Sequence, residues 1–491
     1  VGATRTPAAP LGVAAVTTFG SAPAVQIGSS TRDITIGNVG ATADTAFGFV
    51  TQGAMAANGV YDNVDTVALV VGGAGKAVNL NGGINNLSTT SGQQAIAFEA
   101  NATAMSIRSG ASMGEIRNGG TISSLISTAT ASDQSRAIDI QAGAKVDTIT
   151  NTGSIIAASS GLTGVTRAIT DASGTVSKIN NTGAIVASIS PPTGVTGTVT
   201  GTLIAIDASA NTTGLAVTSS QSAVKDSAAP AIVGDIYFGS GADSLTVSAG
   251  TVVGAMNFGA GADALTISGD TTAVTGAVRD DGTGGLSIAV NSGKLSVSNA
   301  EVIQGSSLTL GAKSALIVSA DPLTASKDSK NAIAVTHIQV ADANIAGGAQ
   351  VGLTLQNLVT ETTKLTVISA SNSMTLGGPL GTTVLENAPF LYKVTSSADT
   401  AAREVYLTVA RRTTVELGFN AAQAAAYDAV FSALTKDKGI QGAILAQTSQ
   451  AGLSSLYNQL LPSQGEGVFS ALDASMAVVG RMIDERPDVE Q

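Results

Sequence analysis

Two stretches of alternating hydrophobic and polar residues repeat at a fixed distance near the middle of the chain. Residues 236–247 read IYFGSGADSLTV, and residues 256–267 read MNFGAGADALTI. Phe238 recurs as Phe258, which is an offset of 20 residues. A fixed period of this length is typical of a solenoid, in which each repeat stacks on the next one. The pattern therefore predicts stacked short strands, with function spread over a long side surface.

A looser repeat precedes this one, between residues 31 and 230. An apolar residue, a turn that contains Asn and Gly, and a second apolar residue recur as IRNGGTI from Ile116, ITNTGSI from Ile149 and INNTGAI from Ile179. A partial copy begins at Ile84, so the offsets are 32, 33 and 30 residues (84 to 116, 116 to 149, 149 to 179). Asn and Gly accept the backbone of a sharp corner, and stacked Asn side chains can hydrogen-bond to one another. We expect two short strands per repeat, because a companion element (AID, AIT, AID) lies between the copies.

The pattern changes again toward the C-terminus. The strict period is lost after residue 320, and alternation predicts longer strands at 350–355, 364–368, 390–394 and 404–409. Helical spacing with Asn420 as the N-cap then predicts a helix over 420–434, followed by short helices at 439–447 and 453–461. A last amphipathic helix is expected at 466–484, with an apolar stripe of Val468, Leu472, Met476, Val479 and Ile483.

The fold class that follows is all-β: a right-handed parallel β-helix with a C-terminal β cap and a short α-helical tail. Four regions are expected along the chain. Residues 1–30 form an N-terminal arm or cap, 31–320 the β-helix repeats, 321–415 the β cap, and 416–491 the α-helical region.

Composition agrees with this fold and narrows the partners. Only 12% of the 491 residues are charged, and the 44% that are hydrophobic include few aromatics and no Trp. Small β-branched side chains suit stacked strands. The net charge of −11, without a basic stripe, argues against nucleic acid as a partner. The absence of cysteine excludes disulfides and thiolate metal sites.

The order of these parts resembles the passenger of a bacterial type V autotransporter. A Gly- and Asn-rich β-solenoid is followed by a segment with Leu391-Tyr392 and VYLTVARRT from Val405, and then by helices that contain LYNQLLP from Leu456. The resemblance implies a β-helix exported by a C-terminal translocator, with residues near 321–412 nucleating passenger folding. The family ends with a β-barrel, but this chain stops at Gln491. Residues 463–491 then resemble the stretch that leads into the barrel pore.

Several short motifs can be weighed for chemistry. Residues 239–245 (GSGADSL) match part of a calcium-binding nonapeptide, so Asp243 and Asp263 are candidate ligands. That site needs tandem repeats nine residues apart, whereas the offset here is 20. We therefore expect these Asp residues to cap turns and expect no metal or other cofactor.

Two features bear on nucleophilic catalysis. Residues 110–114 (GASMG) fit the G-x-S-x-G pattern around Ser112, but a nucleophile elbow needs a strand-to-helix turn and a His partner. His337 is the only histidine, and a triad would have to use it with a nearby acid such as Asp342. No serine motif accompanies it, so we expect His337 to be a structural or surface residue and Ser112 to lie in a turn.

Two further features concern sugars and membranes. Asp280 and Asp281 form a carboxylate pair that can serve glycoside hydrolysis at a suitable separation, but sugar-binding grooves usually also use aromatic platforms. The apolar stripe at 468–483 has no basic face, so we expect it to pack against protein.

The sequence therefore favours a non-enzymatic protein of the cell surface, with no catalytic residues. Its expected role is adhesion, biofilm formation or self-assembly into a surface array, because a weakly charged side wall offers many shallow contacts. The expected partners are its own translocator, other copies of the chain, and a surface glycan or host ligand. The alternatives are a β-helix enzyme acting on polysaccharide and a calcium-dependent secreted β-roll.

Overall fold

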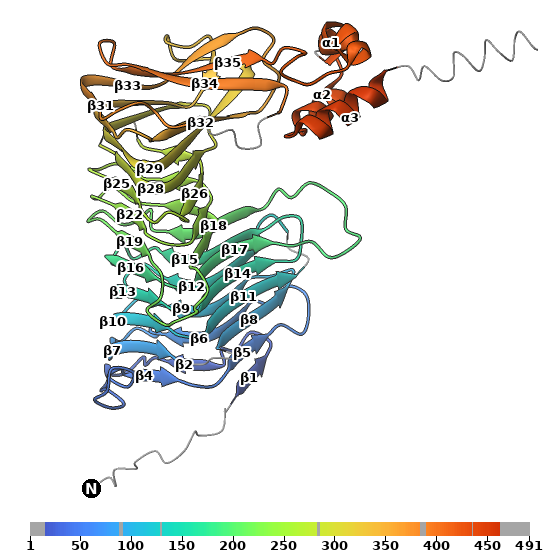
Figure 1. Cartoon of the computed structure of the whole chain (residues 1–491). Helices are drawn as coiled ribbons and strands as arrows, with labels where there is room; N and C mark the ends of the chain where they lie inside the picture. The colour runs from blue at the N-terminus through green and yellow to red at the C-terminus, as the bar shows by residue number, and fades with distance from the viewer. Residues whose placement is uncertain are drawn as a thin grey trace, which may run out of the picture.

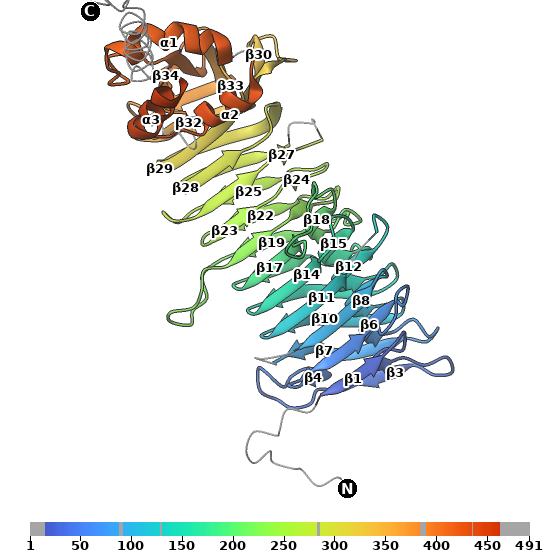
Figure 2. The same cartoon turned by 90° about the vertical axis from the view of Figure 1, so that its right-hand side faces the viewer.

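A computed structural model describes residues 15–87, 92–127, 130–281, 285–382, 389–434 and 436–461. The chain forms a long stack of strands that rises from the N-terminal end to three helices at the C-terminal end (Figures 1 and 2). Almost all strand pairs are parallel, and each strand pairs with strands one turn earlier and one turn later. The expected parallel β-helix with a short helical tail is therefore confirmed.

Three ladders of strands form the sides of the solenoid. The first is named here the β10 ladder and contains β3 (Ile34–Ile36), β4 (Phe49–Thr51), β7 (Val78–Asn86), β10 (Ala111–Asn118), β13 (Lys145–Asn151), β16 (Lys178–Asn181), β19 (Ala216–Ser219), β22 (Ser244–Val247) and β25 (Ala264–Ile267). The β11 ladder contains β1 (Val16–Phe19), β5 (Met55–Asn58), β8 (Gln93–Phe98), β11 (Thr121–Ser127), β14 (Ser154–Ser159), β17 (Ala184–Ile189), β20 (Ala231–Val233), β23 (Thr251–Val253) and β26 (Ala273–Gly276). The β12 ladder contains β2 (Val25–Ile27), β6 (Thr66–Val71), β9 (Ala102–Ile107), β12 (Gln134–Ile140), β15 (Val165–Asp171), β18 (Thr202–Asp207), β21 (Asp235–Tyr237), β24 (Met256–Asn257) and β27 (Val278–Arg279).

The repeat offsets read from the sequence are the pairing registers of the β10 ladder. Ile116 pairs with Ile84 and with Ile149, and Leu245 pairs with Leu265. The companion element lies on the β12 ladder, where Ile138 pairs with Ile169. The expectation of two strands per repeat is wrong, because the β11 ladder adds a third. Strands of the β11 ladder directly follow the Asn-Gly corner. In the sequence they therefore look like a continuation of the preceding strand of the β10 ladder.

Aliphatic residues point inward from all three ladders and form one large core, with a small second cluster around Ala95 and Ile126. Ile84, Ile122 and Ile138 are fully buried representatives of the three sides. Each stacks on a residue of similar shape in the next turn, so the core has few large side chains and no Trp. Phe238 and Phe258 are two of the larger core side chains, and their rings stack with 5.1 Å between centroids. Small β-branched side chains thus fill the solenoid by repetition.

Parallel stacking continues past residue 320, where we expected the repeats to end. The next strands are long, and each contributes to more than one side. They are β28 (Ser287–Val297), β29 (Val302–Ala325), β31 (His337–Ile345), β32 (Gln350–Leu355) and β33 (Thr363–Leu376). The strict period is lost here because an antiparallel hairpin between β29 and β30 (Ile333–Val335) lengthens one turn.

Antiparallel strands close the C-terminal end, and the helices lie to one side of them (Figure 1). β35 (Glu404–Arg411) pairs in antiparallel fashion with both β33 and β34 (Tyr392–Asp399). The helices are α1 (Ala421–Leu434), α2 (Lys438–Leu445) and α3 (Gln450–Leu460). The predicted N-cap of the first helix is confirmed, because the Asn420 side chain accepts a hydrogen bond from the backbone of Gln423. Residues 1–14 of the expected arm and the helix expected at 466–484 lie outside the described residues.

Candidate functional site

The hairpin loop between β29 and β30 (residues 326–332) lies over His337, the first residue of β31. Asn331 fixes this loop, because its side-chain amide donates to the carbonyl of Thr366 and accepts from the Thr366 backbone N–H, at 2.9 and 2.8 Å. The amide thus replaces a neighbouring strand at this edge. Lys330 reaches from the same loop to Glu404 on β35, with 2.6 Å between its Nζ and Oε1. The loop therefore lies firmly against the outer side of the last turns.

His337 is enclosed beneath this loop, where its imidazole contacts an acid on one side and a serine on the other. Its side chain is fully buried. Nδ1 lies 2.7 Å from Oδ2 of Asp328, and Nε2 lies 2.8 Å from Oγ of Ser369 on β33. Asp342, the acid considered from the sequence, instead accepts hydrogen bonds from Asn372 and Ser373. The structure thus rules out a surface position for His337 and assigns it a different acid.

Burial and neighbouring charges set the protonation of this cluster. Burial lowers the pKa of His337, although the hydrogen bond and charge of Asp328 oppose the shift. Burial acts in the opposite sense on Asp328, but hydrogen bonds from the Lys330 backbone, His337 and Asn331 leave its pKa below the ordinary value. The cluster therefore holds a carboxylate beside a neutral imidazole near neutral pH.

Two hollows flank the cluster, one on the acid side and one on the serine side. A cavity of about 640 Å³ is lined by Asp328, and a second of about 560 Å³ is lined by Ser369. Gln304 on β29 lines both of them. The buried histidine therefore connects an acid at the edge of one hollow to a hydroxyl at the edge of the other.

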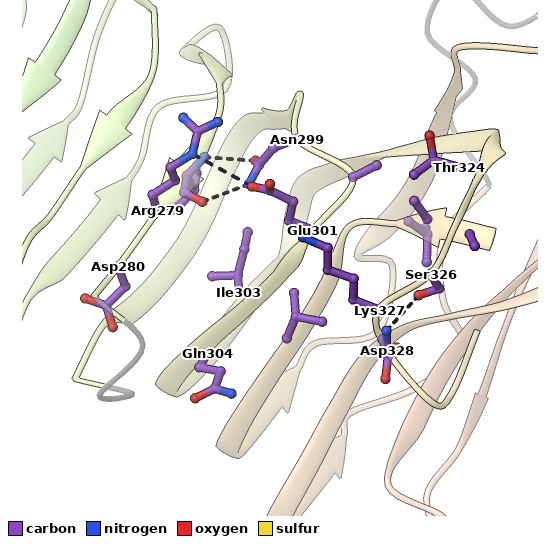
Figure 3. A pocket seen from close by; sticks show the side chains of 16 residues that line it. Arg279, Asp280, Asn299, Glu301, Ile303, Gln304, Thr324, Ser326, Lys327 and Asp328 are labelled. Carbon is purple, nitrogen blue, oxygen red and sulfur yellow. Dashed lines mark hydrogen bonds and ion pairs between the residues drawn. The ribbon is translucent and has the colours of Figure 1, made fainter. Parts of the chain in front are cut away.

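The larger hollow arises where the β12 ladder is interrupted (Figure 3). β27 does not pair with the next turn, and the Asn299 side chain instead binds both backbone groups of Val278, at 3.1 and 3.2 Å. Arg279 and Glu301 line the opening as a partly exposed ion pair, with 3.8 Å between Nε and Oε2. This hollow therefore has a paired Arg279 and Glu301 at its opening and Asp328 of the histidine cluster at its edge.

The candidate calcium ligands lie in a different corner, and each binds backbone of another turn. Oδ1 of Asp243 accepts the N–H of Leu215 at 2.6 Å, and Oδ1 of Asp263 accepts the N–H of Asp243 at 2.8 Å. Burial, with a smaller contribution from the charge of Asp263, raises the pKa of Asp243 to about 6. These carboxylates therefore join successive turns, as corner caps do.

The remaining candidates from the sequence do not converge on one site. Ser112 lies in β10, where it pairs with Asn79 and Lys145, so the G-x-S-x-G match is a strand preceded by a turn at Gly110. Asp280 lies at the edge of the larger hollow, and the backbone N–H of the adjacent Asp281 donates to the carbonyl of Gly259. The stripe at 468–483 lies outside the described residues.

Sequence reasoning missed Asp328 and Ser369 because no motif marks them. One signal was present. Ser369 follows His337 by 32 residues, close to the offset of 30 at which β31 and β33 pair (338 to 368), so a spacing of about one turn was the available hint. Asp328 gave no such signal, since its position depends on how the hairpin loop folds back.

No family model, no curated protein and no solved structure matches this chain. Within the described ranges, no group of three or more His, Asp or Glu side chains is placed to hold a metal ion. None of the three helices there is long and apolar enough to cross a membrane.

Proposed function

We propose that this chain is an exported, cell-surface passenger of the type V autotransporter kind, with a structural or adhesive role. The support is the order of its parts: a long parallel β-helix, then antiparallel strands, then helices. Its proposed partners are its own C-terminal translocator and other copies of itself. The side walls are proposed to contact a surface glycan or a host ligand as well.

A stripe on the outside of the β11 ladder is the observation that carries self-association. Ile156, Val186, Val233 and Val253 occupy one outward-facing column in consecutive turns. The first three are half-buried, and Val253 is 46% exposed. β-branched side chains repeated at strand spacing form a flat, uncharged surface that fits a second copy of itself. We name this column the valine stripe.

Electron microscopy of the purified chain at rising concentration tests this role. We expect filaments or sheets whose lateral contacts use the valine stripe. Val233→Lys places a charge in the stripe and should disperse the assemblies into single rods. Asn257→Lys is the matched control, because Asn257 is a half-buried outward residue on the β12 ladder and its replacement should leave assembly intact. Single rods at all concentrations would contradict self-association.

Surface export is tested separately. Antibodies against the solenoid should label intact cells that express the natural gene, and added protease should remove the label. Labelling only after the cells are broken would contradict export, whatever the purified chain does in the microscope.

Calcium provides the clearest distinction from the β-roll alternative. Because both candidate carboxylates bind backbone, a chelator should leave the melting temperature unchanged. A large fall in melting temperature that added calcium reverses would favour the β-roll. The second alternative is the polysaccharide enzyme, and no observation on the described residues favours Asp280 and Asp281 as its catalytic pair.

A further inference from the structure

We propose that Asp328, His337 and Ser369 form a nucleophilic site that hydrolyses short acyl esters. Ser369 is the nucleophile, His337 the general base, and Asp328 the residue that positions the imidazole. This activity goes beyond the structural role proposed above and does not depend on it. Either can fail without the other, because the cluster lies in the last turns and the valine stripe lies on earlier ones.

The contacts meet the requirement for an activated serine. A nucleophilic hydroxyl needs a base within hydrogen-bonding distance, and that base needs a third group to orient it. Ser369 and Asp328 satisfy this on opposite nitrogens of His337, at 2.8 and 2.7 Å. Because the Asp328 carboxylate accepts the proton of Nδ1, the lone pair of Nε2 is directed at the Ser369 hydroxyl.

Asp328 is itself held in place. It is almost fully buried, and it also accepts hydrogen bonds from the Lys330 backbone N–H at 3.1 Å and from Asn331 at 2.9 Å. Three charged groups face His337: Asp328 and Lys330 from the hairpin loop, and Glu404 from β35. The neutral amide of Gln339 is also close, with 3.2 Å between its Nε2 and Nδ1 of His337. Burial outweighs the attraction of the acids and keeps the imidazole neutral, as a base must be.

The serine side of the cluster is open to a substrate. Ser369 is half-buried and lines the smaller hollow, together with the small residues Gly305, Ala341 and Ala370. Arg403 also lines it and has a φ of +56°, which is uncommon for a residue with a long side chain. Its Nε donates to the carbonyl of Ala370 at 3.1 Å, which holds the guanidinium beside the residue that follows Ser369. A positive charge here favours the oxyanion that forms during acyl transfer.

The chemistry of the hollow indicates the class of substrate. Beside Ser369 the lining combines small residues such as Ala341 and Ala370 with the charged side chain of Arg403, so a short acyl group on a polar alcohol fits best. Oγ of Ser369 bonds to the carbonyl carbon while its proton passes to Nε2 of His337. The ester C–O bond then breaks, and the alcohol leaves with that proton. Water, deprotonated by His337, releases the carboxylic acid and restores Ser369.

Labelling of the intact chain by a fluorophosphonate tests the nucleophile without any substitution. Ser371 is the internal control, because it is an exposed serine on the same strand and lines the same hollow, whereas the only histidine bonds to Ser369. Mass spectrometry should find the adduct on Ser369 at a rate about 100-fold or more above Ser371. Ser369→Ala should abolish the fast labelling, because the serine that bonds to His337 is then gone. Equal or absent labelling of the two serines would overturn the proposal.

Hydrolysis of p-nitrophenyl acetate tests the base and its positioning residue. The rate should rise with pH to a plateau, with an apparent pKa below the ordinary histidine value of about 6.5. Asp328→Asn should slow the reaction at least tenfold and shift the profile to lower pH, because the imidazole loses its charged partner. A structural role for Asp328 would not move the profile. Circular dichroism shows whether each variant is folded. If folded Ser369→Ala hydrolyses the ester as fast as the wild type, the proposed activity is excluded.

Discussion

One column of the β10 ladder is built in two ways along the solenoid. In the lower half it contains Asn86, Asn118, Asn151 and Asn181, which are buried and bonded in series from Nδ2 to Oδ1 at 2.7 to 2.8 Å. In the upper half the same column continues as Val247, Ile267, Val290 and Leu310. Ser219 lies between the two sections. We name the lower section the asparagine ladder and the upper section the aliphatic column.

The two sections stabilise the same corner of the solenoid by different interactions. An amide donates to one neighbour and accepts from the other, so a stack of Asn satisfies itself while its remaining hydrogens cap corner carbonyls. The aliphatic column leaves those carbonyls to other partners and contributes hydrophobic burial instead. In the upper half the polar corner residues lie elsewhere, as the buried Asp243 and Asp263. The identity of a side chain therefore matters strictly where hydrogen bonds run from turn to turn, and loosely where only volume is required.

The largest expected effect comes from placing a charge within the asparagine ladder. Asn151→Asp replaces a donor with a carboxylate oxygen that faces Asn181 Oδ1, Gly153 O and Ala184 O. We expect the free energy of unfolding to fall by about 3–5 kcal/mol, because a buried group loses its partners and gains repulsion. Chemical denaturation measures this loss.

Asn180→Asp is the matched control for that substitution. Asn180 is half-buried on the outer side of β16, next to a ladder residue, and accepts a hydrogen bond from Thr218. A carboxylate can accept the same bond, so the expected loss is below about 1 kcal/mol. Equal losses in the two variants would mean that the asparagine ladder is not the special feature of this corner.

Close approach of backbone gives the second largest effect, and it belongs to the upper half. Gly259 has a φ of +74°, and a Cβ there would lie 1.9 Å from the carbonyl oxygen of Gly239 in the turn below. Gly259→Ala should cost about 2–3 kcal/mol in unfolding free energy. Gly442→Ala in α2 should stabilise by up to about 1 kcal/mol, since nothing lies within 4 Å and alanine favours the helix. A neutral Gly259→Ala would show that the upper corner can widen.

Asp243 should make the upper half sensitive to pH, with a smaller effect. Its folded-state pKa of about 6 exceeds the ordinary value of about 3.9 in an unfolded chain. The folded state therefore binds the proton more tightly than the unfolded chain does. The stabilising contribution of the protonated Asp243 is fully present below about pH 4 and is lost as the pH rises to about 6. Asp243→Asn removes this dependence and should raise the unfolding free energy at pH 7.5 by about 1–2 kcal/mol.

Melting of the Asp243→Asn variant and the wild type across pH 4 to 8 isolates this carboxylate from the others. The advantage of the variant should grow between pH 4 and 6 and then stay level. A difference that is constant with pH would contradict the raised pKa. We thus expect opposite outcomes at the two corners: Asp243→Asn stabilises the upper one, whereas Asn151→Asp destabilises the lower one.

Repetition decided which features could be read from the sequence. Ile116 and Ile149 share a local pattern, so the register of their strands followed from an offset alone. The sequence of the cap does not repeat. Nothing in the pattern after residue 320 predicted that a hairpin is inserted there while parallel stacking continues. The cluster of Asp328, His337 and Ser369 depends on this irregular part. Its acid comes from a loop whose path is determined by side-chain contacts such as those of Asn331, which no period encodes.

The smallest effect concerns Ser219, where the asparagine ladder meets the aliphatic column. Its Oγ is buried and has no hydrogen-bond partner within the described part of the chain. Ser219→Ala should therefore leave stability unchanged or raise it by up to about 1 kcal/mol, since the variant no longer buries an unpaired hydroxyl. Ser159→Ala should instead cost about 1 kcal/mol, because that equally buried hydroxyl donates to Thr163 O and accepts from Gly161 N–H. Thermal melting of the pair compares them directly, and a loss at Ser219 equal to that at Ser159 would mean that the ladder extends one turn further than its amides.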